Sequence, residues 1–227
     1  MTEFLRLAGT IAAKDLRAEF RNKEVLNAAF SFMIVVLLLF SFAFDPITNP
    51  EVRDMAGGLL WIVYAFAAVL VLNRSFARET ANECLDALVA SPAPASTLFL
   101  GKCVANSALL LVLELISLPV FMVFYDVRWP EAFGELLLVF VLGTWALAAV
   151  GTMFSAITAN NRLRELMLPL LVFPITLPAL MACVDLTTLA LAGEVPASAE
   201  VWWRLLIVFD LIFTLLGAVL LETVLVS

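Results

Sequence analysis

The sequence predicts an all-α membrane protein with six transmembrane helices, an N-terminal amphipathic interfacial helix and a further helix in a cytoplasmic loop. Of the 227 residues, 63% are hydrophobic and 15% are charged, whereas soluble domains contain roughly 45–50% apolar and about 25% charged residues. The mean hydropathy is +1.05. Six apolar runs suit a hydrocarbon core of about 30 Å, and they cover residues 25–44, 57–72, 98–124, 135–158, 166–190 and 203–226.

Residues 1–24 differ in character from the membrane domain that follows, residues 25–227. At 100° per residue, one arc of a helix collects Arg6, Thr10, Lys14, Arg17 and Arg21. The opposite side carries Leu5, Ala8, Ala12 and Leu16. We expect a helix along the cytoplasmic membrane surface. Because Asp15 and Glu19 interrupt its apolar side, protein as well as lipid is expected to contact it; a basic flank that only sets the topology is the alternative.

The positions of Lys and Arg predict the orientation. Ten of the 13 basic residues lie in the N-terminal segment and in the second and fourth loop regions, and three lie in the alternate loops. Since Lys and Arg concentrate in cytoplasmic loops, both termini are expected in the cytoplasm. Aromatic residues near the outer ends of the spans suggest a headgroup belt, formed by Trp61, Tyr125, Trp129, Trp202 and Trp203.

Residues 77–90 of the first cytoplasmic loop favour a short helix. Leu85 and Leu88 form most of its apolar face, and Pro92 and Pro94 end it. A groove on a partner can bury such a face, so the pattern predicts a protein docking site. A helix lying on lipid is the alternative.

Several residues inside the spans are unusual for their position. Glu114 and Asp210 are costly in hydrocarbon unless paired or hydrated, and either a polar path or a structural hydrogen bond would explain them. The second run is short, so we expect it to extend back through Met55 or to lie tilted. The fifth span is expected to be kinked or broken, because helical hydrogen bonds are lost at Pro169, Pro174 and Pro178.

Small residues follow one face of the fourth span. They are Thr144, Ala148, Gly151, Thr152 and Ser155. Such a face lets two helices approach closely. Packing within the chain and contact in a homodimer both remain open from the sequence.

The composition argues against an enzyme. The chain has no histidine and three cysteines without metal-like spacing, so a catalytic triad or a structural zinc site is not expected. Gly101-Lys102 resembles the end of a P-loop, but Ser96 stands where that motif needs glycine. No basic cluster suits nucleic acid, and Trp202-Trp203 is expected to be a belt pair rather than a heme site because histidine is missing.

Several stretches in order along the chain resemble the heme exporter protein B family, the permease subunits of cytochrome c maturation, within the ABC-2 type transporter permeases. They include Lys14-Asp15-Leu16-Arg17, Asn73-Arg-Ser-Phe-Ala-Arg-Glu79, Phe99-Leu-Gly-Lys102 with Asn106, and Leu168-Pro-Leu-Leu-Val-Phe-Pro174. The resemblance runs over nearly the whole chain, and it rests on the order, length and topology rather than on one motif.

The resemblance implies a multi-pass permease of the cell inner membrane that works with a separate ABC ATP-binding subunit, heme-handling membrane subunits and a heme chaperone. ATP would bind the ATP-binding subunit and heme the partner subunits, with no cofactor on this chain. The ATP-binding subunit would dock on the loop helix, through Arg78, Glu79, Glu83, Leu85, Asp86 and Leu88. The ATP-driven step would carry heme outward or release the heme-loaded chaperone, and the lack of histidine favours release.

Two other functions fit the same residues. A permease of this fold could export another small molecule or a lipid, in which case Glu114 or the fifth span should line a cavity between protomers. A membrane scaffold would need no ATPase and should tolerate charge at Leu85 and Leu88.

Overall fold

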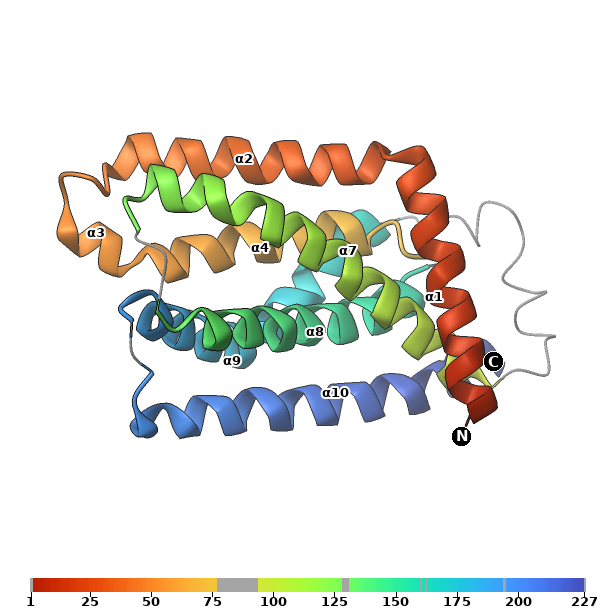
Figure 1. Cartoon of the computed structure of the whole chain (residues 1–227). Coiled ribbons are helices and arrows are strands. Elements are labelled where there is room, and N and C mark those ends of the chain that lie inside the picture. Colours follow the sequence, from red (N-terminus) through yellow and green to blue (C-terminus); the bar gives the residue numbers. More distant parts are fainter. Residues whose placement is uncertain are drawn as a thin grey trace.

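The computed structural model describes residues 2–76, 94–127, 131–159, 161, 163–193 and 195–226. Within these ranges the chain is a bundle of long helices, with one helix, α1 (Thr2–Asn22), lying across one end (Figure 1). Lys23 has a left-handed backbone, φ 55°, and turns the chain from α1 into the bundle. We call the end that carries α1 and both termini the α1 end, and the end that carries α3 (Pro50–Asp54) the α3 end.

The bundle consists of α2 (Glu24–Phe44), α4 (Ala56–Leu72), α7 (Ala95–Phe124), α8 (Phe133–Ile157), α9 (Arg164–Leu191) and α10 (Glu200–Val226). These helices begin and end within three residues of the six predicted runs. Five of them are long and apolar enough to cross a membrane, while α4 has 17 residues. The predicted extension through Met55 is wrong, because α4 begins at Ala56 and Met55 is its exposed N-terminal cap.

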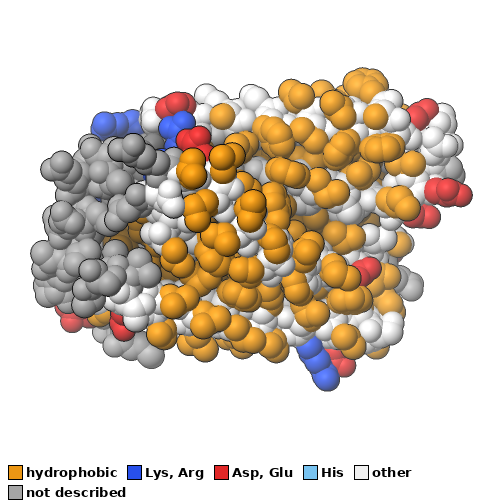
Figure 2. All heavy atoms as spheres, turned by 180° about the vertical axis from the view of Figure 1, so that it is seen from behind, with side chains coloured by type: hydrophobic (Ala, Val, Ile, Leu, Met, Phe, Trp, Pro, Cys, Tyr) orange, Lys and Arg blue, Asp and Glu red, His pale blue; other side chains and the backbone are white. Residues whose placement is uncertain are grey.

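The surface around the middle of the bundle is apolar. Figure 2 shows hydrophobic side chains over most of the face seen from behind, with most charged side chains near its margins. Large apolar side chains such as Phe42, Val123 and Leu170 are more than 70% exposed. Contact of such an apolar surface with water is unfavourable, whereas contact with lipid is not. The chain is therefore a multi-pass α-helical membrane protein.

Helix α8 is the centre of the bundle and contacts α4, α7, α9 and α10. The small face predicted on this span is buried within the chain, at Thr144, Ala148, Gly151, Thr152 and Ser155. A Cβ atom at Gly151 would overlap the Leu72 side chain of α4. The small residues therefore serve packing within the protomer, so a contact between two copies would need another face.

The fifth span was expected to be kinked or broken, and the structure contradicts the second of these alternatives. A break in the fifth span is excluded, because α9 is one uninterrupted helix that contains all three prolines; each proline removes a single donor, and packing against α8 and α4 keeps the rest of the helix in place. Trp61 and Tyr125 are not belt residues, since they are 1% and 0% exposed. They donate hydrogen bonds inside the bundle, to Thr187 Oγ1 (2.8 Å) and Leu37 O (3.2 Å). Trp202 and Trp203 are half-buried at the α3 end, and Trp129 lies outside the described residues.

Candidate functional site

At the α1 end, helix α1 packs closely on α7. Ala8 and Ala12 of α1 are buried, and the contact is made possible by Gly101 of α7. A Cβ atom at Gly101 would lie 2.8 Å from Ile11 Cβ and 2.9 Å from Ala8 O. Small residues on both helices thus bring α1 against the start of α7, while Leu5, predicted on the same side, is 62% exposed on the flank of the helix.

Beside this contact lies a buried lysine. Lys102 is 1% exposed, and its ammonium donates to Asp15 Oδ2 of α1 at 3.1 Å and to the backbone oxygen of Ser75 at 2.7 Å. The same nitrogen lies 4.6 Å from the centre of the Phe76 ring, within the range of a cation–π contact. We call these four residues, Asp15, Ser75, Phe76 and Lys102, the Lys102 cluster.

The Lys102 cluster joins three separate parts of the chain. Asp15 belongs to α1, Lys102 to α7, and Ser75 with Phe76 to the turn that follows α4. This turn leads directly into residue 77, where the predicted docking loop begins. A displacement of that turn would therefore act on α1 and α7 at once.

Polar contacts continue from the cluster into α8. The Asn106 side chain donates to Ser75 Oγ and to Thr152 Oγ1, both at 2.9 Å. Ser155 donates to Leu72 O at 2.9 Å. A cavity of about 40 Å³ beside Asp15 and Asn106 is large enough for one water molecule. The turn after α4 is thus tied by hydrogen bonds to α8 as well as to α7.

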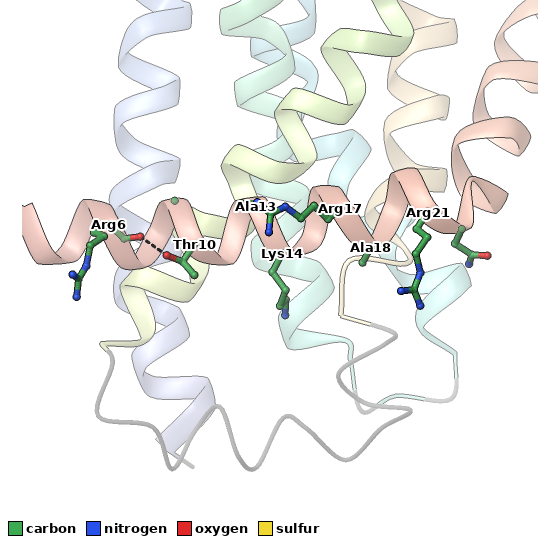
Figure 3. Close-up of a pocket in the computed structure, with 9 residues that line it drawn as sticks. Arg6, Thr10, Ala13, Lys14, Arg17, Ala18 and Arg21 are labelled. Carbon is green, nitrogen blue, oxygen red and sulfur yellow. Dashed lines mark hydrogen bonds between the residues drawn. The ribbon is translucent and has the colours of Figure 1, made fainter.

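The opposite side of α1 is basic. Figure 3 shows Arg6, Lys14 and Arg21 projecting on the side away from the bundle. Together with Thr10 and Arg17, all exposed, they line one open hollow. A row of four cations along one face of a helix favours an anionic partner, either lipid headgroups or an acidic protein surface.

Asp15, predicted with this helix, lies on the bundle side and accepts from Lys102. The predicted docking residues lie outside the described part of the chain: Arg78, Glu79, Glu83, Leu85, Asp86 and Leu88. The contacts of these six side chains stay a prediction.

Glu114 lies in the interior of the bundle, 1% exposed. Its Oε2 accepts from Thr144 Oγ1 of α8 at 2.7 Å, and its Oε1 has no hydrogen-bond partner. Its backbone oxygen accepts from Ser117 Oγ (2.9 Å) and Tyr64 Oη (3.3 Å). Tyr64 also belongs to an aromatic cluster with Trp61 and Phe140, whose rings pack edge to face with centres 5.6–5.9 Å apart.

Asp210 of α10 is the second buried carboxyl group. It is 7% exposed, and neither of its carboxyl oxygens has a hydrogen-bond partner, so no hydrogen bond joins it to Glu114. Across the ranges that the structure describes, no group of three His, Cys, Asp or Glu side chains is placed to hold a metal ion.

The role of Lys102 was not predicted from the sequence, where Gly101-Lys102 was considered as the end of a nucleotide motif and as part of one stretch of the family resemblance. In the structure Gly101 and Lys102 together make the contact with α1. A signal was present: Asp15 and Glu19 stand on the otherwise apolar side of α1, and Lys102 stands inside the third apolar run. A carboxylate and an ammonium that both face the interior need each other as partners.

Comparison with known proteins gives a consistent result. Residues 6–224 match the family described as "CcmB protein". The chain is 30% identical to heme exporter protein B of Paracoccus denitrificans over 189 residues, which cover 83% of this chain and 86% of that protein. It is 29% identical to heme exporter protein B of Rhodobacter capsulatus, with 82% and 86% covered. The protein of the same name from Pseudomonas aeruginosa is 28% identical, with 85% of each chain covered.

Proposed function

The chain belongs to the CcmB protein family, and from this premise we propose that it is the membrane permease subunit of an ABC-type heme exporter for cytochrome c maturation. The observation that carries the proposal is the match over nearly the whole length of the chain to proteins named heme exporter protein B. The apolar helical bundle agrees with a membrane subunit, which is a transporter component rather than a catalyst.

The proposed topology has six spans in the cell inner membrane with both termini in the cytoplasm. At about 1.5 Å per residue, the 17 residues of α4 reach about 25 Å, which suits a span packed among longer helices. Basic residues support the orientation, since Arg6, Lys14, Arg17 and Arg21 all lie at the α1 end. By the positive-inside rule this end is cytoplasmic.

A separate ATP-binding subunit would supply the energy. In this proposal it docks on the loop helix 77–90 through the apolar pair Leu85 and Leu88, while α1 lies on the same end of the bundle with its basic face toward the cytoplasm and the lipid headgroups. Heme-handling membrane subunits and a heme chaperone would meet the complex and carry the heme.

The movement itself would be a rocking of the spans driven from the loop. The chain would act as a mechanical coupler whose outer surface changes affinity for the heme-loaded chaperone. The hydrogen bond between Glu114 and Thr144 favours a structural role for Glu114, as a link between α7 and α8. Asp210, with neither oxygen bonded, is the better candidate for a polar contact that changes during the cycle.

An open hollow of about 490 Å³, lined by Phe66 of α4 and by Phe173 and Leu177 of the fifth span, favours export of another small molecule or a lipid as the second candidate function.

The proposal is tested by affinity purification of the tagged protein in mild detergent. We expect wild type to retain an ATPase together with heme-handling proteins, and Leu85→Asp/Leu88→Asp to lose the ATPase. Leu163→Asp/Leu166→Asp is the matched control, because these leucines are 60% and 69% exposed at the same end of the bundle. If wild type retains no ATPase, the proposed function is wrong.

A further inference from the structure

We propose that Lys102 is a positioning residue through which the loop after α4 moves α1 and α7 during ATP-driven work. The inference rests on the proposed function and adds to it a site that lies outside the predicted docking helix. It identifies the path from the loop into the spans with a definite set of contacts, those of the Lys102 cluster.

The ammonium group of Lys102 lies next to the turn that leads into the loop. It donates hydrogen bonds to the backbone oxygen of Ser75, two residues before the loop begins at residue 77, and to Asp15 of α1. Because the acceptor is a backbone oxygen, the hydrogen bond responds to movement of the main chain and does not depend on the rotamer of the Ser75 side chain. Any pull on the turn after α4 therefore reaches the ammonium directly.

The ion pair between Lys102 and Asp15 is largely buried. Lys102 is 1% exposed and Asp15 carries 21% exposure in its side chain, so the pair is largely shielded from water. Separation of such a pair in a medium of low dielectric is costly. The turn, α1 and α7 are thus favoured to move as one body, because independent movement would pull the charges apart.

Close contacts at Gly101 and Asn106 surround the ion pair. At Gly101 helix α1 comes so close to α7 that a Cβ atom there would lie 2.9 Å from Ala8 O. Asn106 ties the same Ser75 to Thr152 of α8. The cluster therefore lies where α1, α4, α7 and α8 meet. Asn106 is thus one link from the turn to the central helix, beside the hydrogen bond from Ser155 to Leu72 O.

A structural role and a positioning role for Lys102 predict different results. An ion pair replaced by apolar side chains of similar size often keeps or raises stability. If Lys102 only stabilises the fold, Asp15→Leu/Lys102→Met should restore both stability and function relative to Lys102→Met. If Lys102 positions the loop, the double variant should be stable but still uncoupled.

The experiment uses the complete complex in cells and after purification. We compare wild type, Lys102→Met and Asp15→Leu/Lys102→Met for thermal stability, retained ATPase, ATP hydrolysis and the cellular yield of holocytochrome c. We expect the double variant to melt within a few degrees of wild type and to retain the ATPase. We also expect its yield of holocytochrome c to fall at least tenfold while ATP hydrolysis continues.

Recovery of the yield together with stability in the double variant would overturn the inference and leave the proposed function standing. A wild-type yield in Lys102→Met would do the same. If the wild-type complex contains no ATPase, the proposed function fails, and the inference fails with it.

Discussion

At the α1 end, the ammonium of Lys102 lies 3.1 Å from the Asp15 carboxylate and 2.7 Å from the Ser75 carbonyl. Inside the bundle, Asp210 is about as deeply buried, yet neither of its oxygens has a hydrogen-bond partner. Both groups are expensive to remove from water. The paired group holds three elements together, whereas the unpartnered group adds a burial cost without a compensating bond. Burial of a charge thus says little about its role until its partners are known.

The largest loss of stability is expected when the charge of Asp15, the partner of Lys102, is removed. Asp15→Asn keeps an oxygen that can accept from Lys102 but removes the negative charge, which weakens the pairing with the buried Lys102 ammonium and with the exposed Lys14, each 3.1 Å from Asp15. We expect the free energy of unfolding to fall by about 2–3 kcal/mol, at the low end for a broken buried pair because Asp15 is partly exposed. Unfolding in mixed micelles measures it, with Glu3→Gln on the exposed side of α1 as control. A loss equal to that of the control would contradict the pairing.

The approach of α1 to α7 sharpens the comparison, because the Lys102 cluster forms only if the helices touch. Gly101→Ala places a methyl group 2.8 Å from Ile11 Cβ and 2.9 Å from Ala8 O, and we expect a loss of about 1–3 kcal/mol from overpacking. Gly9→Ala on α1 is the matched control, because nothing lies within 4 Å of its Cβ position. That control should stabilise the protein by about 0.5–1 kcal/mol through helix propensity. Equal effects of the two substitutions would show that α1 is not packed on α7 there.

Glu114 is intermediate between Lys102 and Asp210, because one of its carboxyl oxygens accepts a hydrogen bond and the other does not. Thr144→Val removes the single side-chain donor with little change of shape. We expect a loss of about 1–2 kcal/mol, the usual cost of leaving a buried acceptor without its bond. The same unfolding assay measures it, with Thr214→Val on α10 as a comparison that breaks a less buried bond to Trp145. No loss with Thr144→Val would mean that water or another donor replaces the hydroxyl.

The smallest loss of stability is expected at Asp210, whose carboxyl oxygens accept no hydrogen bond. Asp210→Asn removes a potential charge that has no hydrogen-bond partner in the bundle, so the free energy of unfolding should stay the same or rise. The substitution is chemically identical to Asp15→Asn, which makes the two a matched pair. A loss above about 1 kcal/mol would reveal a partner for Asp210. If the variant is stable but holocytochrome c is lost, Asp210 acts in the transport cycle.

The helices were predictable from the sequence because their signal is local. Each apolar run is set by its own composition, and the observed helices match the runs within three residues. The basic face of α1 was equally predictable, since a period of 3.6 residues places Arg6, Lys14 and Arg21 together without knowledge of any other helix.

The inward face of α4 was not predictable, whereas small residues had marked the face of α8 that is buried inside the chain. Almost every residue of α4 is apolar, so its composition does not separate the side that faces lipid from the side that faces protein; Trp61 was therefore expected at the headgroups and lies in the core. The pairing of Lys102 with Asp15 spans 87 residues of chain. Only the packing of α1 on α7, decided by Gly101, brings the two together.

The most direct test of the proposed function compares the two ends of the bundle. A photo-cross-linking residue is placed at Arg17, exposed at the α1 end, and in a second variant at Ile47, 62% exposed at the α3 end. The proposal predicts a cross-link to an ATP-binding subunit from position 17 and none from position 47. A cross-link to that subunit from position 47, with none from position 17, would contradict the proposed orientation.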